Sequence, residues 1–110
     1  MAKPKEDLKA RALDLTELVQ YQADSIVSRT ILDKDVGTVT LFAFAQGQAL
    51  SEHTAPFDAM VHILDGEAQI TVSGKPIHAR AGQLVIMPAD KPHALKAACP
   101  FKMLLIMIRA

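Results

Sequence analysis

The sequence predicts an all-β domain with the architecture of a sandwich or barrel. About eight short segments rich in β-branched and other apolar residues follow one another, with turn residues every 8–12 positions or so. The length of 110 residues fits one domain. Half of the residues are hydrophobic and 22% are charged, which is typical of a chain that buries a core.

The predicted strands begin after residue 24, where the composition changes. Residues 1–24 are predicted to form an N-terminal extension, in which loosely spaced leucines favour a short amphipathic helix on the outside of the domain. Residues 25–110 are predicted to form the barrel domain. Its expected strands cover residues 26–32, 36–45, 57–64, 67–73, 77–80, 84–87, 93–98 and 101–109. Asp65-Gly66 predicts a tight turn between the third and the fourth of these strands.

The last predicted strand is apolar on both faces. Every residue from Met103 to Ile108 is apolar, so neither face of an antiparallel sheet can lie against water at this strand. Together with Phe42 and Phe44, this run predicts a homodimer in which a second copy covers the outer surface, with help from the N-terminal helix. Coverage by the helix alone is the alternative.

The charge balance disfavours two classes of partner. Twelve basic residues balance twelve acidic ones, whereas proteins that bind nucleic acid or anionic membranes carry a positive excess. No apolar run approaches the roughly 20 residues that span a bilayer, and the N-terminus has no signal-peptide core. The single cysteine, Cys99, predicts a packed thiol and no disulfide. We therefore expect a cytoplasmic protein with no nucleic-acid or membrane partner.

Two histidines are the main candidates for chemistry. His53 and His93 lie 40 residues apart, next to predicted strands, and a barrel can bring both into one cavity. Neutral imidazole nitrogen binds Zn, Fe, Cu, Ni and Mn, so the pair is a candidate for a divalent metal. A structural role for each histidine at a strand end is the alternative.

Two segments resemble the motifs of the cupin family. Residues 47–66 are similar to its first motif and residues 82–97 to its second, with Asp90 at a glycine position and Ala97 at an asparagine position. The matching positions are Gly47, His53 and Gly66, then Gly82, Pro88 and His93. The resemblance covers residues 25–109 and is typical of small single-domain bacterial members of the RmlC-like cupin superfamily, of the cupin-2 conserved-barrel type. It implies a double-stranded β-helix, or jelly-roll barrel.

The chain departs from the family at the metal site. The family's site uses two histidines and a glutamate of the first motif and the histidine of the second. Here Ala55 stands at the second histidine position, and Ala59, or Met60 with a longer spacer, stands at the glutamate position. The resemblance therefore implies a degenerate metal site that keeps two of four ligands, His53 and His93.

Asp58 is a weaker candidate ligand, because it lies one residue from the glutamate position. With His53 and His93 it would form a set of two imidazoles and one carboxylate, which suits Fe(II). On a regular strand with Ala59 facing inward, however, Asp58 faces outward.

The two alanines also open space at the predicted barrel mouth. Such a mouth would be mostly apolar with a few polar groups, as small-molecule pockets are. Its predicted lining is His53, Ala55, Ala59, Met60, Met87 and His93. Three functions stay open: a small-molecule-binding cupin with a degenerate metal site, a metal-dependent enzyme of dioxygenase or isomerase type that uses Fe, Mn, Ni, Cu or Zn, and a non-catalytic structural or interaction module. A fold alone does not choose among them.

Overall fold

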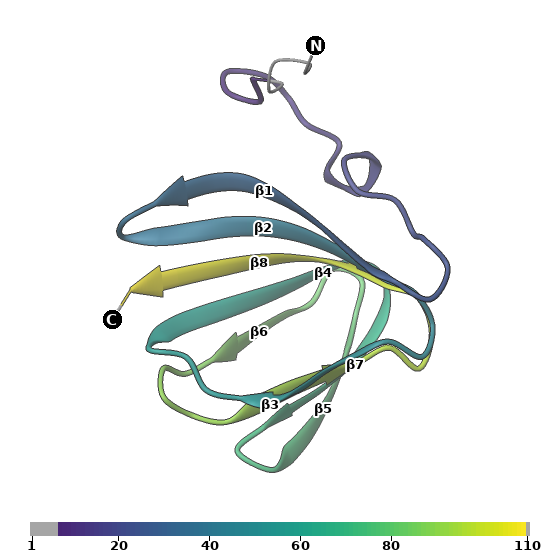
Figure 1. Cartoon of the computed structure of the whole chain (residues 1–110), viewed down its shortest axis with the longest axis vertical. Coiled ribbons are helices and arrows are strands. Elements are labelled where there is room, and N and C mark those ends of the chain that lie inside the picture. The colour runs from purple at the N-terminus through teal and green to yellow at the C-terminus, as the bar shows by residue number, and fades with distance from the viewer. Residues whose placement is uncertain (1–6, 110) are drawn as a thin grey trace.

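A computed structural model, which describes residues 7–109, shows a curled antiparallel β-structure (Figure 1). A short 3₁₀ turn precedes the strands. The elements are η1 (Leu15–Glu17), β1 (Ile26–Lys34), β2 (Gly37–Phe44), β3 (Ala49–His53), β4 (Phe57–Val72), β5 (Lys75–Arg80), β6 (Leu84–Met87), β7 (His93–Lys96) and β8 (Phe101–Arg109). The predicted all-β jelly-roll barrel is confirmed.

Two sheets face each other and share one strand. The larger sheet has the order β1-β2-β8-β4-β6, and the smaller sheet has the order β5-β4-β7-β3. The first half of β4 pairs with β8 and β6, and its second half pairs with β7 and β5. The chain therefore passes from one wall of the barrel to the other within a single strand.

The predicted turn at Asp65-Gly66 is wrong, because β4 runs through it as one strand of 16 residues. The pairing of β4 with β8 shifts between Ile63 and Asp65, which marks a bulge. Gly66 has φ +73°, and a Cβ atom there would lie 2.0 Å from the carbonyl oxygen of Pro100. Glycine thus allows β4 to bend into the second sheet instead of reversing.

Strand β3 was not predicted from the sequence. His53, which we placed next to a predicted strand, is the last residue of β3. Four of the five β3 residues are exposed, and β3 pairs only with β7 at the edge of the smaller sheet. A short edge strand of this kind has no apolar alternation for sequence reasoning to detect.

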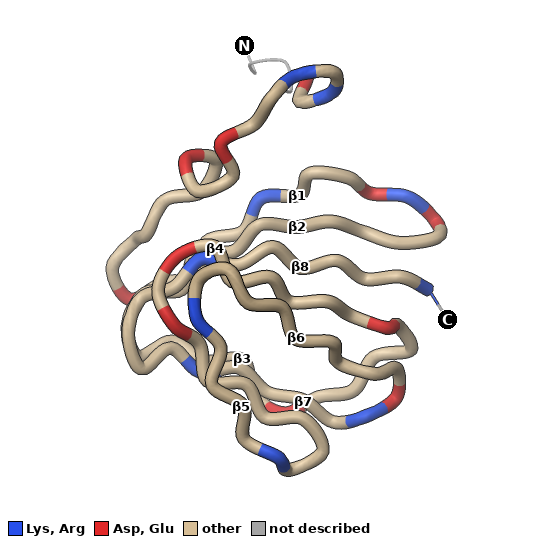
Figure 2. The backbone as a smooth tube through the Cα atoms, turned by 180° about the vertical axis from the view of Figure 1, so that it is seen from behind, with Lys and Arg blue, Asp and Glu red and all other residues tan. Residues whose placement is uncertain are grey.

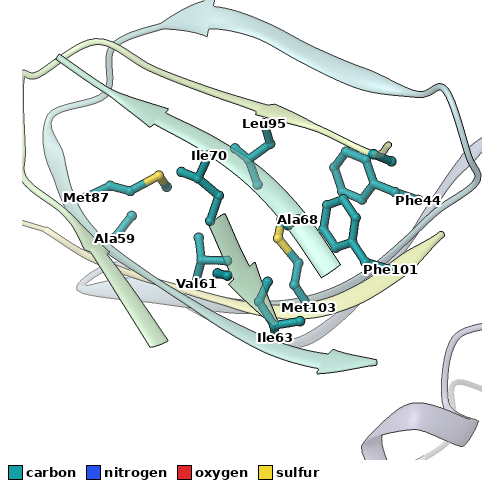
Figure 3. Packing of buried hydrophobic residues seen from close by; sticks show 12 residues of the cluster. Phe44, Ala59, Val61, Ile63, Ala68, Ile70, Met87, Leu95, Phe101 and Met103 are labelled. Carbon is teal, nitrogen blue, oxygen red and sulfur yellow. The ribbon is translucent and has the colours of Figure 1, made fainter. Parts of the chain in front are cut away.

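The core lies between the two sheets. The rings of Phe44 and Phe101 stack with centroids 4.5 Å apart, and both residues are fully buried. Figure 3 shows these rings at one end of the apolar cluster, with Met87 and Ala59 at the opposite end. Aromatic rings therefore fill one end of the barrel, and the candidate site belongs to the other end.

The predicted N-terminal helix is wrong for the described residues 7–24, whose one helical element is the 3₁₀ turn η1. The buried Lys102 donates a hydrogen bond from Nζ to the carbonyl oxygen of Thr16, at 2.6 Å. This carbonyl is therefore bound by the barrel instead of by a helical N–H group. Leu15, Leu18 and Val19 nevertheless cover part of the outer face of the larger sheet, against a cluster that includes Leu41.

Phe42 and Phe44, which we expected on the outer dimer surface, both pack into the core between the sheets. Outward positions of β2 are instead Gly37, Val39 and residues 41 and 43. Figure 2 shows no charged residue on β2, and on β8 only at its ends, so the middle of the larger sheet is uncharged.

Within residues 7–109, no helix is long and apolar enough to cross a bilayer.

Candidate functional site

The structure brings His53 and His93 together. His53 ends β3 and His93 begins β7, and the two residues are directly opposite each other in the pairing of these strands. Their Nε2 atoms lie 3.0 Å apart. The ring centroids are 4.3 Å apart and the ring planes are inclined by 71°, so the rings meet edge to face.

Each ring is fixed by a hydrogen bond at its other nitrogen. Nδ1 of His53 lies 2.8 Å from the carbonyl oxygen of Ser51, and Nδ1 of His93 lies 3.2 Å from that of Lys91. A carbonyl oxygen only accepts, so this geometry assigns the proton of each neutral ring to Nδ1. Both Nε2 atoms then present lone pairs to each other. At 3.0 Å two lone pairs repel, and the contact is favourable only when a proton, a cation or a hydrogen-bond donor joins it.

The two rings differ in burial. His93 is 6% exposed, whereas His53 is exposed. Burial lowers the pKa of His93 from its ordinary value, the nearby His53 lowers it further, and the hydrogen bond with the Lys91 carbonyl opposes the shift. His93 is therefore the neutral acceptor of the pair.

The loop between β6 and β7 sets the position of His93. The backbone N–H of Ala89 donates to Oδ1 of Asp58 at 2.9 Å, and the N–H of Asp90 donates to the carbonyl oxygen of Ala55 at 2.8 Å. Asp90 has φ +63°, a left-handed conformation that aspartate tolerates better than most residues. Aspartate is therefore compatible with the loop conformation at the glycine position of the second cupin motif.

Asp58 does not join the histidines. It is exposed, and its neighbour Ala59 faces inward with 3% exposure. Its Oδ1 atom holds the loop through Ala89 instead. Sequence reasoning missed this role, for which the signal was the turn-rich stretch of residues 88–92 after an apolar strand.

The remaining predicted pocket residues do not all lie on one face. Ala59 and Met87 are direct partners in adjacent strands and are both buried in the core. Ala55 is half-buried in the segment between β3 and β4. Met60 points to the outer face, because inward and outward positions alternate along β4 and its neighbours are buried. Met60 therefore does not line the barrel mouth.

The other two histidines lie elsewhere. Nε2 of His78 lies 3.2 Å from Oε2 of Glu67 on β4, and both side chains are more than half exposed. His62 is half-buried on the outer face of β4. The thiol of Cys99 is free, half-buried, and donates to the carbonyl oxygen of Glu67.

The donor set does not fit the family's usual four-ligand metal site. His53 and His93 supply two nitrogen atoms, and Ala55 and Ala59 supply no donor atom. Among residues 7–109, no three His, Cys, Asp or Glu side chains cluster so that they could hold a metal ion. The site is thus a pair of imidazoles that offers two nitrogen donors.

Comparison with known proteins agrees with the fold and with the motifs. Residues 40–108 match the family described as the cupin domain, and this match includes both histidines. The chain belongs to the cupin family. Its motif departures are therefore departures within the family and not signs of another fold.

Several solved structures are similar to this cupin over nearly its whole length. A conserved Streptococcus pyogenes protein of unknown function, SPY1581, is 37% identical, with a TM-score of 0.90 over 100% of this chain and 96% of that chain. A cupin superfamily protein from Desulfitobacterium hafniense is 31% identical, with a TM-score of 0.89 over 99% and 100%. A cupin 2 conserved barrel domain protein from Leptotrichia buccalis is 40% identical, and the match covers 88% of this chain and 47% of that chain at a TM-score of 0.86. A search of functionally curated proteins found no match.

Proposed function

We propose that this cupin binds a small organic acid, with His53 and His93 as the polar anchor at the open end of the barrel. The observation that carries the proposal is the 3.0 Å contact between two Nε2 atoms whose partner nitrogens are both held by carbonyl groups. This contact is incomplete without a proton or another donor. A proton taken up from solvent and shared between the two Nε2 atoms makes the pair cationic, and a bound carboxylate stabilises that charge.

The surroundings support a binding site more than a reactive one. Ala59 and Met87, two of the predicted lining residues, are apolar, and apolar surroundings with few polar groups are typical of small-molecule sites. The carboxylate considered as a third ligand, Asp58, is exposed and accepts a hydrogen bond from the N–H of Ala89 instead of contacting the histidines. The ligand itself therefore provides the charge that the protonated pair needs.

The experiment is a thermal-shift and calorimetry series with matched probes. Acetate, benzoate and oxalate are compared with benzamide and benzyl alcohol, on the wild type and on His53→Gln. We expect the carboxylates, and not the neutral analogues, to raise the Tm of the wild type, with proton uptake on binding. His78→Gln is the matched control, because His78 pairs with Glu67 away from the site. Equal responses of wild type and His53→Gln would overturn the proposal.

A two-histidine metal site is the second candidate, and the spacing of the nitrogen atoms favours it. Two nitrogens 3.0 Å apart that both bind one ion at about 2.05 Å subtend an angle of about 94°, close to the right angle of octahedral coordination. Tetrahedral coordination would need a separation of about 3.35 Å. Elemental analysis of protein purified without added metal separates the candidates: stoichiometric metal that is lost in His53→Gln supports this one, and its absence removes it.

A further inference from the structure

An arginine lies at the open end of the barrel, on the larger sheet, whereas the histidine pair lies on the smaller one. Arg109 ends β8, and strand pairing places it directly opposite Phe57, the first residue of β4. The central guanidinium carbon of Arg109 lies 5.6 Å from the centroid of the Phe57 ring, within the range of a cation–π contact. The arginine and the ring therefore form one unit at the rim.

This unit is on the inner face of the larger sheet. Met107 and Ala59 are the next inward partners along the same two strands, and both belong to or pack against the core cluster. Residues two apart on a strand share a face, so Arg109 and Phe57 also face inward. Phe57 is half-buried and Arg109 is exposed, which places the guanidinium at the entrance to the space between the sheets.

The chain connections place this entrance beside the histidine pair. Residues 54–56 alone join the end of β3, which is His53, to the start of β4. Within this connection, the carbonyl oxygen of Ala55 accepts a hydrogen bond from the N–H of Asp90, in the loop between β6 and β7. Figure 1 shows the end of β8, marked C, on the same side of the barrel as both connections. The histidine pair and the arginine therefore lie on the rim of one opening.

The guanidinium of Arg109 is suited to bind an anion. It carries five N–H donors in a fixed fork, and this fork binds a carboxylate through two parallel hydrogen bonds. Within residues 7–109, no carboxylate lies within ion-pair distance of this guanidinium. Asp58, the acid next to Phe57, is exposed and accepts a hydrogen bond from the N–H of Ala89. The Phe57 ring thus holds a cation whose preferred partner is a carboxylate.

We propose that Arg109 is the second anchor of this site and that the ligand is a short dicarboxylate, with one carboxylate at the histidine pair and the other at Arg109. This inference rests on the proposed function, which assigns the first carboxylate. Packed sheets lie about 10 Å apart, and the anchoring side chains project into that space from both walls. The remaining span suits a chain of a few carbon atoms, and Met107 and Ala59 offer apolar contacts to its methylene groups. Phe57 is a positioning residue, because it acts through the guanidinium.

Calorimetry with a series of diacids tests the second anchor. Malonate, succinate, glutarate and adipate are compared with butyrate, a monocarboxylate with the carbon chain of succinate, at neutral pH and constant ionic strength. We expect the best diacid to bind the wild type at least about tenfold more tightly than butyrate, because a bidentate charged contact is added. The affinity should pass through a maximum within the series, because the two anchors are fixed. Sulfate is the control for divalent anions in general, since it cannot span the opening.

Substitutions at the two anchors separate their contributions. Arg109→Gln should remove the advantage of the diacids and leave the affinity for butyrate nearly unchanged. His53→Gln should weaken the binding of butyrate and of the diacids alike. The matched control is Arg80→Gln, because Arg80 is exposed at the end of β5, where the neighbouring Ala79 faces inward. This control should bind every probe as the wild type does.

The ratio of the diacid affinity to the butyrate affinity tests Phe57. Phe57→Leu should lower this ratio several-fold, because the guanidinium loses the ring that holds it, and Phe57→Tyr should retain it. A merely structural role of Phe57 would change both affinities together and leave the ratio unchanged. Circular dichroism verifies that each variant is folded.

The outcomes distinguish this inference from the proposed function. Butyrate that binds through the histidines, with no diacid bound more tightly or with an advantage that survives Arg109→Gln, would overturn the second anchor and leave the proposed function standing. Sulfate that binds as tightly as the best diacid would do the same. A wild type that binds no carboxylate would overturn both.

Discussion

Gly66 passes so close to Pro100 that a Cβ atom on Gly66 would lie 2.0 Å from the Pro100 carbonyl oxygen. This contact is where β4 bends from the larger sheet into the smaller one. The position requires glycine for two reasons. A side chain would clash with the Pro100 carbonyl, and the φ of +73° disfavours any other residue. The histidine site depends on this bend, because the second half of β4 pairs with β7. In this pairing, Val72 of β4 lies opposite His93 of β7.

Gly66→Ala should therefore destabilise the fold far more than Gly74→Ala. Gly74 has a similar φ, +79°, but a Cβ atom there meets nothing within 4 Å. The left-handed conformation alone costs about 1–2 kcal/mol in each variant. The clash with Pro100 adds to this only at Gly66, so we expect that variant to unfold at clearly lower urea concentration or to fail to fold. Equal urea midpoints for the two variants would show that the approach to Pro100 is not tight.

The stability of the protein should fall as the pH drops, through His93. Burial lowers the pKa of His93 in the folded state, so the unfolded chain binds its proton more readily. The contribution is complete above the ordinary value of 6.5, and it is lost progressively as the pH falls from there toward the lower pKa of the folded state. Each unit of lowering corresponds to about 1.4 kcal/mol.

Urea unfolding of wild type and His93→Gln between pH 8 and pH 5 or so measures this effect. We expect the wild type to lose more stability than the variant over this interval. His62 and His78 are common to both proteins, so their contributions cancel. Parallel pH profiles in the two proteins would contradict the burial of a neutral His93.

Lys102 should anchor the N-terminal segment to the barrel. Its Nζ atom donates to the carbonyl oxygen of Thr16 and lies 4.9 Å from the ring centroid of Tyr21. The Tyr21 hydroxyl donates in turn to Asp65, and burial, followed by this hydrogen bond, raises the pKa of Tyr21. Asp65 and Lys102 are also direct partners in the pairing of β4 with β8.

Lys102→Met keeps the length of the apolar stem but removes the donor and the charge. A hydrogen bond from a charged group contributes about 1.5–3 kcal/mol, so the η1 turn should open more often. Hydrogen exchange at the amides of Glu17 and Leu18, which close this turn, should be at least about tenfold faster. The control is Lys75→Met, which removes an exposed lysine from β5. Unchanged hydrogen exchange at these amides in Lys102→Met would show that Lys102 does not hold the N-terminal segment on the barrel.

The double change Ala55→His with Ala59→Glu should rebuild a four-ligand metal site with His53 and His93. Overpacking costs about 1–3 kcal/mol before any metal binds, because Ala59 is buried. Metal that binds only the folded state then adds about 2.7 kcal/mol at a hundredfold excess over its Kd. The variant should thus melt lower than wild type in chelator and gain more Tm from Ni²⁺, Mn²⁺ or Zn²⁺.

The control with similar volumes is Ala55→Gln with Ala59→Gln, which should gain no such response. Asp58→Ala tests the weaker candidate ligand in parallel. We expect its metal response to equal that of the wild type, because Asp58 faces outward and binds Ala89. Equal metal responses of the double variant and the wild type would mean that the motif alignment is displaced by a residue.

The sequence predicted most strands because their signals are local. The strands predicted at residues 36–45 and 101–109 correspond to β2 and β8 almost residue for residue. The prediction of a tight turn at Asp65-Gly66 was wrong because a turn dipeptide and a glycine bulge have the same appearance in a sequence. Only the nearby Pro100, 34 positions away in the chain, distinguishes them.

The candidate site was predictable in its residue types and less so in its geometry. Strand parity placed Ala59 inward and Asp58 outward, but the same parity should have excluded Met60 from the mouth. The carbonyl groups of Ser51 and Lys91, which orient the two rings, have no side-chain signature. The N-terminal leucines predicted a helix, whereas the structure has a 3₁₀ turn in which the Thr16 carbonyl accepts a hydrogen bond from Lys102 of the barrel, a contact between distant residues.

Long-range ¹H–¹⁵N NMR of the histidine side chains tests the central claim, that His53 and His93 act as one anchor with fixed tautomers. Near pH 7.5 we expect both rings to carry hydrogen on Nδ1, with Nε2 of His93 unprotonated. Addition of benzoate should shift the Nε2 signals of His53 and His93 together, with one Kd, and should leave His62 and His78 unchanged. A His93 ring protonated at Nε2 instead of Nδ1, or signals of the two rings that respond independently, would contradict the account.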